Sequence, residues 1–189
     1  MPKNVITALL ITFICYGFIT GCSKESEQQF DPPEMVLPGS KDYAKGLELL
    51  KKQDIASAIP LFEKAIEQGN PEANYHMGLL HARGDNVKQD YMLAHEHFHK
   101  AAMMGHPKAL YYLGHLYGEG SGVEQDYVEA LKWFWLSASY GDKRAKKFIR
   151  VMINKVTTEE YQRAEIEVKE LWEQLPHDVF LRKEEMVLH

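Results

Sequence analysis

Residues 107–141 read PKALYYLGHLYGEGSGVEQDYVEALKWFWLSASYG, and residues 71–105 read PEANYHMGLLHARGDNVKQDYMLAHEHFHKAAMMG. The two stretches align at an offset of 36 residues, with small residues on small residues. Aligned pairs include Ala73 with Ala109, Gly78 with Gly114, Gly84 with Gly120, Val87 with Val123 and Phe98 with Phe134. A fixed period of about 20 to 50 residues is typical of proteins built from stacked repeats. The sequence therefore predicts several copies of one small unit.

Each unit is expected to contain two helices joined by a glycine-rich turn. Apolar and small residues recur at helical spacing over residues 109–117 and again over residues 130–138. The connection GEGSGV over residues 118–123 contains glycines, which adopt the left-handed conformations that such turns need. In the earlier copy, Asn86 takes the place of Gly122, and Asn tolerates that conformation well. We call the first helix of each unit helix A and the second helix B.

The pattern Ala-x-x-x-Leu-Gly-x-x-Tyr-x-x-Gly-x-Gly-Val-x-x-Asp, followed by Ala-x-x-Trp-Phe and Ser-Ala, resembles the Sel1-like repeat. The match is close over residues 107–141 and good over residues 71–105, where His81 and His97 replace the preferred Tyr and Trp. This family is related to the tetratricopeptide repeat. The resemblance implies an all-α fold, an αα-hairpin solenoid, that acts as a protein–protein interaction scaffold, usually without catalysis.

A third, earlier unit is recognisable over residues 40–69. Its helix B keeps the offset of 36 residues, whereas its helix A aligns at an offset of 32, so four residues are missing from the loop at residues 51–54. Pro60 is expected in the first turn of this helix B, where a missing N–H is harmless. We expect repeat units at about residues 41–70, 71–106 and 107–142.

Residues 143–175 are expected to cap the repeats. The apolar face continues after the third unit, but the glycine-rich loop does not return, and the residues on that face are Ala145, Phe148, Val151 and Met152. Thr157 followed by Glu159 and Glu160 predicts the start of a last helix. This helix resembles the closing helix of many Sel1-like proteins. The solenoid is thus expected over residues 41–175, with a C-terminal tail at residues 176–189.

The N-terminal segment resembles a bacterial lipoprotein signal. An uncharged apolar run from Val5 to about Phe18 is short for a membrane span, which needs about 20 residues, and suits a signal peptide. The run closes on Ile19-Thr20-Gly21-Cys22, which resembles the lipobox, so residues 1–21 are expected to be removed and Cys22 to carry lipid. An uncleaved signal anchor is the alternative. Residues 22–40, rich in polar residues and proline, are expected to form a flexible tether.

The expected location is the cell envelope, on the periplasmic face of the outer membrane. In bacterial lipoproteins, an Asp directly after the lipidated Cys favours retention in the inner membrane, and this chain has Ser23 at that position. The chain has a formal net charge of −5, which predicts no basic patch or polybasic run. Nucleic acids and anionic headgroups are therefore not expected as partners. With Cys15 removed and Cys22 lipidated, no thiol is left to form a disulfide.

Residues 95–99 read HEHFH and match H-E-x-x-H, in which two histidines bind zinc and the glutamate acts as a base. The repeat register argues against a zinc site at His95, Glu96 and His99, because this stretch aligns with a helix B whose equivalent residues are Leu131 and Trp135. An alternative that requires no catalysis is regulatory or adventitious metal binding by His95 and His99. No other catalytic pattern is present, so no cofactor is expected and the chain is not expected to be an enzyme.

The candidate binding surface is the concave side lined by helix A. By analogy with tetratricopeptide repeats, its positions are Tyr43, Tyr75, Tyr111, Leu79 and His115. Tyrosines give large contact areas at a low entropic cost, although these tyrosines could equally serve packing. Trp133 is expected in the core, and Trp135 is expected to face outward or to contact another unit.

The sequence thus predicts a lipid-anchored, non-catalytic scaffold, either a monomer or part of a hetero-complex, that binds an unknown envelope protein or peptide. Two alternatives from other classes are an enzyme, either the zinc-dependent hydrolase or a cell-wall-acting protein, and a structural assembly factor of an envelope complex.

Overall fold

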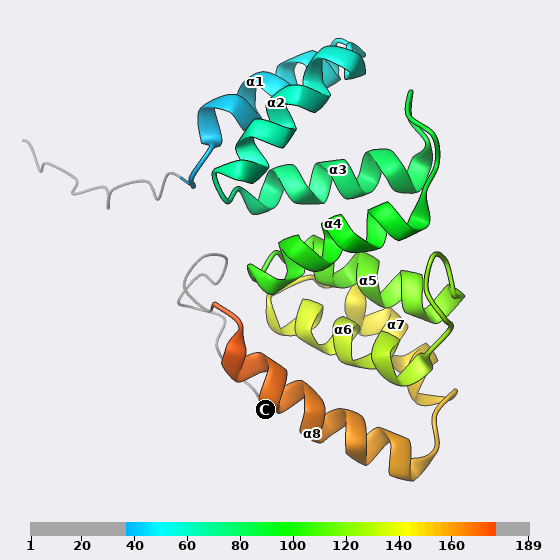
Figure 1. Ribbon diagram of the computed structural model, residues 1–189. Coiled ribbons are helices and arrows are strands. Elements are labelled where there is room, and N and C mark those ends of the chain that lie inside the picture. Colours follow the sequence, from blue (N-terminus) through cyan, green and yellow to red (C-terminus); the bar gives the residue numbers. More distant parts are fainter. Residues whose placement is uncertain (1–36, 177–189) are drawn as a thin grey trace, which may run out of the picture. The chain divides into compact units, whose positions relative to one another are not determined.

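The computed structural model describes residues 37–176. The predicted signal peptide, Cys22 and nearly all of the predicted tether and tail lie outside these residues. Within residues 37–176 all regular structure is helical (Figure 1). The helices are α1 (Ser40–Lys51), α2 (Ile55–Glu67), α3 (Pro71–Arg83), α4 (Tyr91–Met103), α5 (Pro107–Glu119), α6 (Tyr127–Ser139), α7 (Ala145–Ile153) and α8 (Thr158–Gln174). No helix in this range is long and apolar enough to cross a membrane.

The first six helices form three antiparallel hairpins, α1 with α2, α3 with α4 and α5 with α6, as Figure 1 shows. Successive hairpins are joined by packing of α2 on α3 and of α4 on α5. Both α7 and α8 then pack against α6. This arrangement confirms the predicted αα-hairpin solenoid with a closing helix.

Each hairpin is held by a contact between a helix-A glycine and a helix-B phenylalanine. The three phenylalanines are completely or almost completely buried, and the pairs are Gly46 with Phe62, Gly78 with Phe98 and Gly114 with Phe134. A Cβ atom added to Gly78 would lie 2.6 Å from the Phe98 ring, and one added to Gly114 would lie 2.8 Å from the Phe134 ring. Because these distances are far below van der Waals contact, only glycine permits the observed approach of the two helices.

The loops between helix A and helix B follow the predicted lengths. Three residues separate α1 from α2, whereas seven separate α3 from α4 and seven separate α5 from α6. The shortening by four residues is thus confirmed. Asp54, Asp90 and Asp126 end these loops, and the side chain of each accepts a hydrogen bond from the first turn of the following helix.

The cap residues of the last helix are also those predicted. The Thr157 side chain accepts a hydrogen bond from the Glu160 backbone N–H, and the Glu160 carboxylate accepts one from the Thr157 N–H. This reciprocal pair is a capping box. Trp133 is 5% exposed, as predicted, and the half-buried Trp135 packs edge-on against Tyr161 of α8, with ring centroids 5.2 Å apart.

Pro60 and Val151 lie in surroundings other than those predicted. Pro60 lies in the second turn of α2, not in its first, because the short loop ends at Asp54 and starts the helix at Ile55. The carbonyl of Ala56, which Pro60 cannot bond, belongs to an exposed residue and can be hydrated. Val151 is 43% exposed although it was placed on the apolar face, because α6 covers the side of α7 that carries Phe148 and Met152.

The glycine contact predicts opposite effects of one substitution at two positions of α5. Gly114→Ala should destabilise the fold by about 1–3 kcal/mol, because the added methyl group overlaps the Phe134 ring. Gly118→Ala should be neutral or stabilising by up to about 1 kcal/mol, because its Cβ would lie 3.6 Å from its nearest neighbour, Ala130. Urea unfolding followed by circular dichroism measures both. Equal effects at the two positions would show that the close approach is unimportant.

Candidate functional site

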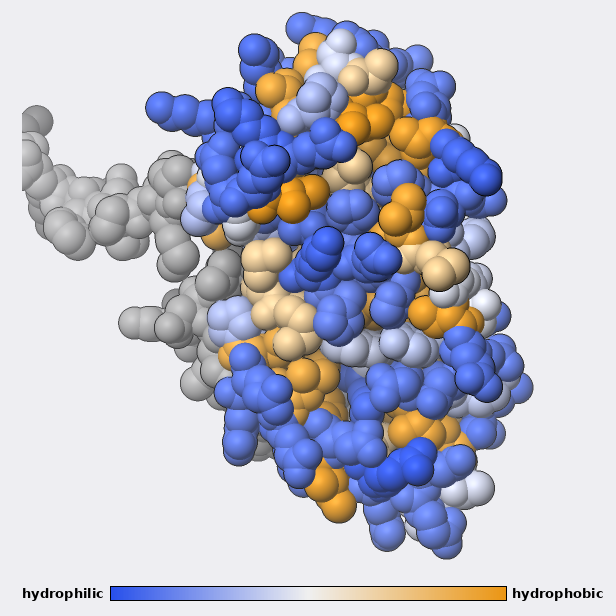
Figure 2. Space-filling model, viewed as in Figure 1, coloured by the Kyte–Doolittle hydropathy of each residue, from blue (hydrophilic) through white to orange (hydrophobic). Residues whose placement is uncertain are grey.

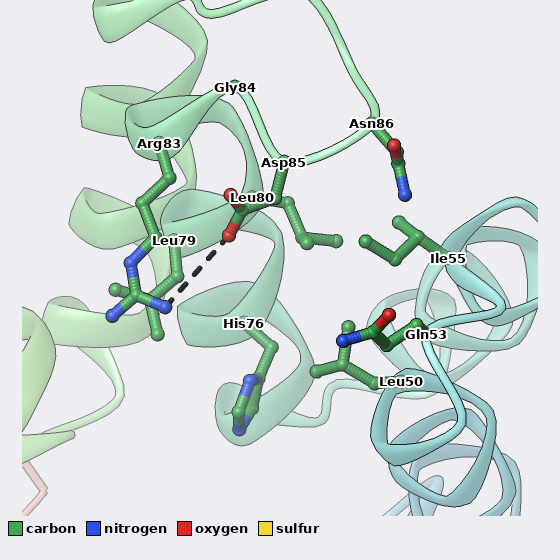
Figure 3. Close-up of a pocket in the computed structure, with 10 residues that line it drawn as sticks. All are labelled: Leu50, Gln53, Ile55, His76, Leu79, Leu80, Arg83, Gly84, Asp85 and Asn86. Atoms are coloured by element: carbon green, nitrogen blue, oxygen red, sulfur yellow. Dashed lines mark ion pairs between the residues drawn. The ribbon is translucent and has the colours of Figure 1, made fainter.

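A pocket of about 670 Å³ lies between the first two hairpins, next to the loop that joins α3 to α4 (Figure 3). Four aliphatic side chains line it: Leu50 and Ile55 from the first hairpin, and Leu79 and Leu80 from α3. Polar lining residues include Gln53, His76, Arg83, Asp85 and Asn86. Arg83 Nη1 lies 4.0 Å from Asp85 Oδ2, and both side chains are about half exposed. Apolar walls with a few polar groups are the usual composition of a ligand pocket.

The pocket exists because the second unit departs from the third at Asn86. In the third unit, Gly122 lies so close to the start of α4 that an added Cβ would be 2.4 Å from the Tyr91 carbonyl carbon. Asn86 aligns with Gly122, and Ile55 aligns with Tyr91. Since Asn86 carries a side chain, its loop cannot lie on Ile55 as closely as the later loop lies on Tyr91. The space between Asn86 and Ile55 is part of the pocket.

The short loop of the first unit contributes its glutamine to the pocket wall. In the two longer loops, a glutamine folds back onto helix A: Gln89 Nε2 donates to the Ala82 carbonyl and Gln125 Nε2 donates to the Gly118 carbonyl, each at 2.9 Å. Gln53 holds the equivalent position in the three-residue loop after α1, directly before Asp54, but it is exposed and lines the pocket. Leu50, at the end of α1, also lines the pocket.

Each of the three predicted tyrosines contacts a residue near the start of the next unit. The Tyr43 hydroxyl donates to Glu72 Oε2 at 3.4 Å. Lys108 Nζ lies 5.8 Å from the centre of the Tyr75 ring, and the Arg144 guanidinium lies 4.1 Å from the centre of the Tyr111 ring. These contacts recur from unit to unit, and the last two are cation–π interactions.

Burial divides the five predicted binding residues into two groups. Tyr75 is 7% exposed and Leu79 is 8% exposed, whereas Tyr43, Tyr111 and His115 are half-buried. The surface that a partner could touch on these residues therefore belongs mainly to Tyr43, Tyr111 and His115. Burial raises the pKa of Tyr75 to about 12, so its hydroxyl stays protonated.

The structure gathers Tyr43, Tyr75 and Leu79 near His76, which lines the pocket. The His76 ring lies 5.8 Å from the Tyr43 ring and 5.2 Å from the Tyr75 ring. Tyr111 and His115 belong to the next unit, with ring centroids 4.7 Å apart. Phe148 of α7 packs against both at 5.6 and 4.4 Å. Tyr112 connects the two groups, because its ring lies 5.9 Å from that of Tyr75 and 5.6 Å from that of Tyr111.

His106 ties the second unit to the third and was missed by sequence reasoning. Its Nδ1 atom accepts a hydrogen bond from the Ala109 N–H at 3.1 Å, so its proton is on Nε2, which donates to Glu72 Oε1 at 3.2 Å. Burial would raise the pKa of Glu72, but the hydrogen bond from His106 and nearby charges bring it below its usual value. His106 aligns with Asn70, the N-cap residue of α3, and this alignment could have identified it.

The H-E-x-x-H motif does not form a metal centre within residues 37–176, where no group of three or more His, Cys, Asp or Glu side chains could hold a metal ion. His95 Nε2 is hydrogen-bonded to the Tyr117 hydroxyl at 3.2 Å, and the His99 ring meets Trp133 edge-on at 5.9 Å. Glu96 is exposed. The described residues give no support to a zinc-dependent hydrolase.

The segment that contains α7 is strongly basic, contrary to the prediction that the chain has no basic patch. Residues 143–155 contain six basic residues and no acidic one, and all six are exposed: Lys143, Arg144, Lys146, Lys147, Arg150 and Lys155. The negative net charge of the whole chain concealed this cluster, which a local charge count would have revealed.

Hydrophobic residues are scattered over the face of the molecule that Figure 2 shows, among larger hydrophilic areas. Among the large hydrophobic side chains of residues 37–176, the largest exposed fractions belong to Met92 at 66% and Ile166 at 60%. The pocket and the basic surface are therefore stronger candidates for recognition than any extended apolar patch in this view.

The family described as Sel1 repeat matches residues 39–70, 71–106 and 107–142, which together make up more than half of the chain. A protective antigen of uropathogenic Escherichia coli with an SLR fold is similar in structure, with a TM-score of 0.68 and 26% sequence identity over 72% of this chain. This chain spans 30% of the length of that protein. A Sel1 repeat protein from Oxalobacter formigenes has a TM-score of 0.56 and 31% identity, over 59% of this chain and 87% of its own. No curated protein matches this sequence.

Two half-buried histidines predict a loss of stability in acid. Burial lowers the pKa of His76 and of His97 to about 4, whereas an unfolded histidine has a pKa of about 6.5. Below pH 6.5 the unfolded chain gains protons that the folded chain cannot accept until about pH 4. The stability present above pH 6.5 is therefore lost as the pH falls through this window, by on the order of 2 kcal/mol for each histidine.

Urea unfolding at pH values from 7 to 4 measures this dependence. The His76→Leu and His97→Leu variants should each show a shallower loss of stability than the unmodified chain. Unfolding free energies that fall equally steeply in all three proteins would contradict the assignment to these histidines.

Proposed function

Because this chain belongs to the Sel1 repeat family, we propose that it is a non-catalytic scaffold that binds a protein or peptide partner on its helix-A side. Sel1 repeat proteins typically mediate protein–protein interactions and are generally not enzymes. The observation that carries the proposal is the pocket between the first two hairpins. Its lining includes aliphatic side chains and His76, and the His76 ring contacts the ring of the half-buried Tyr43.

The chemistry of the pocket suits an extended segment of a partner. Its volume of about 670 Å³ accommodates one or two large apolar side chains against Leu50, Ile55 and Leu79. Arg83 and Asn86 at the rim offer side-chain donors, and Asp85 offers acceptors, to the backbone or polar groups of that segment. Tyr111 and His115, one unit away, would extend the contact along the helix-A side.

A lipid on Cys22 would hold this scaffold at the periplasmic face of a bacterial envelope. Support comes from the sequence alone: the uncharged apolar run before Cys22, the lipobox-like residues at 19–22 and the polar, proline-rich tether that follows. Two or three acyl chains, at about 0.8 kcal/mol for each buried CH₂ group, are sufficient for durable anchoring.

Filling the pocket should weaken partner binding. Arg83→Trp places a bulky ring at the exposed rim, and the expected result is at least about a tenfold loss of affinity, or about 1.4 kcal/mol. Lys100→Trp, on the exposed surface of α4, is the matched control and should bind normally. The measurement is a pull-down from detergent-solubilised envelopes, quantified by mass spectrometry, after circular dichroism has shown that both variants are folded.

A photo-crosslinking residue at Asp85 should form an adduct with the same partner, whereas one at Glu63 on α2 should not, since Asp85 lines the pocket and Glu63 does not. Recovery of identical proteins with Arg83→Trp and with Lys100→Trp would mean that the pocket is not the binding site.

The anchor is tested by labelling growing cells with a palmitate analogue. The unmodified chain should take up the label and sediment with membranes, and Cys22→Ser should lose both properties and retain residues 1–21. Cys15→Ser, in the apolar run, is the control and should remain labelled. A labelled Cys22→Ser protein, or an unlabelled parent chain, would show that Cys22 is not the lipidation site.

A further inference from the structure

The helix α7 occupies the place of helix A in a fourth unit. Phe148 stacks on Phe134 at 5.2 Å and meets Tyr111 at 5.6 Å. One unit earlier, Tyr112 of α5 stacks on Phe98 at 5.0 Å and meets Tyr75 at 5.9 Å. Phe148 follows Tyr112 by the repeat period of 36 residues. α7 therefore packs on the third unit as α5 packs on the second.

No helix B covers α7 within residues 37–176, and one residue explains this. Arg150 stands where the earlier units have Gly46, Gly78 and Gly114, so no phenylalanine can approach α7 in the way that holds the other hairpins. The next helix, α8, packs against α6 instead. The sequence of α7 thus ends the series of hairpins.

The uncovered side of α7, which we call the α7 face, consists of Lys146, Ile149, Arg150 and Ile153. Three of these residues are exposed, whereas Ile149 is half-buried and packs in part against the core around Phe134. In α5, the equivalent side carries Leu110 and Leu113, which α6 and the rest of the core bury completely. The spacing i, i+3, i+4, i+7 gives one continuous stripe along the helix. It is the side that a helix covers in each of the three hairpins.

The charge of the α7 face distinguishes it from the equivalent sides of the other hairpins. Lys146 and Arg150 lie on the stripe itself, and Lys147 and Lys143 lie next to it. None of these four forms an ion pair within residues 37–176, whereas Arg144 is held by Asp142 at 2.6 Å. A surface with unpaired cations around two isoleucines is complementary to a segment that carries both carboxylates and apolar side chains.

We propose that the α7 face is a docking surface for an acidic, amphipathic helix of a partner protein. The proposal rests on the scaffold function above and names a second binding surface for it. The partner helix lies along α7 in place of the missing helix B. Its apolar residues contact Ile149 and Ile153, and its carboxylates bind Lys146 and, in bidentate fashion, Arg150.

Two other occupants fit the α7 face less well. A second copy of this chain, docked through the same face, would set Lys146 and Arg150 of one copy against the same cations of the other. A membrane surface would need large apolar side chains to insert, but Phe148 and Met152 of α7 are packed in the core. The exposed Ile153 and Val151 alone offer little apolar area.

The test uses the full lipidated chain in detergent and three fluorescent synthetic helices of 16 residues. The first carries leucines on one stripe and glutamates beside them, the second has lysine for every glutamate, and the third is a scrambled sequence of the first. Anisotropy titration should show binding of the acidic helix only. Binding should weaken as salt is raised, because exposed charges are screened.

The double variant Lys146→Glu with Arg150→Glu should lose at least about tenfold in affinity for the acidic helix and gain affinity for the lysine helix. Its matched control is Lys51→Glu with Lys52→Glu, which changes the net charge equally at exposed positions of the first unit and should bind as the parent chain does. Equal losses in the two double variants, or equal binding of the scrambled peptide, would overturn the proposal. So would displacement of the acidic helix by phosphatidylglycerol, which would instead assign the face to anionic lipid.

The Arg83→Trp variant distinguishes a failure of the α7 proposal from a failure of the pocket proposal. It should bind the acidic helix normally, because the altered residue lies on α3. If Arg83→Trp loses its envelope partner while the helix still binds α7, both proposals stand. If Arg83→Trp keeps its partner, the pocket proposal fails and the α7 result is unaffected. Loss of helix binding in Arg83→Trp would contradict an independent site on α7.

Discussion

The close contact between a helix-A glycine and a helix-B phenylalanine is the constraint on which the rest of this structure depends. Each hairpin brings two backbones so near that a single methyl group on Gly78 or Gly114 would overlap an aromatic ring. Burying a phenylalanine in this way supplies much of the apolar contact of a unit of only about 36 residues. Where Arg150 takes the place of the glycine, the hairpin does not form and the series ends.

The candidate binding surfaces lie where the chain departs from its own repeat. Asn86 replaces a glycine that lets the next loop lie on the preceding helix. Gln53 in the short loop after α1 lines the pocket, whereas the equivalent glutamines of the other two units bond to a carbonyl near the end of helix A. Together these changes leave the pocket. Arg150 leaves the α7 face uncovered. Regular positions pack against their equivalents in neighbouring units, whereas irregular ones leave surface that another molecule can occupy.

Polar side chains also connect neighbouring units, in addition to the apolar packing between them. The neutral His106 ring joins the N-terminus of α5 to Glu72, which also accepts the hydrogen bond from Tyr43. Tyr75 and Tyr111 are each covered by a cation of the following unit. A partner on the helix-A side would therefore meet tyrosines that are already fixed in position, which lowers the entropic cost of binding.

The sequence by itself determined the fold, the loop shortened by four residues, the capping box at Thr157 and the burial of Trp133. These features follow from helical periodicity, the repeat offset and local capping chemistry, which act within one unit. The tertiary structure alone decided that Tyr75 and Leu79 are largely buried, that a pocket opens beside Asn86 and that one side of α7 is bare. Each depends on side chains about 30 or more residues away along the chain, such as His106 and Lys108 beside Tyr75. A repeat pattern identifies equivalent positions, but the exposure of each position is set by what the neighbouring unit places against it.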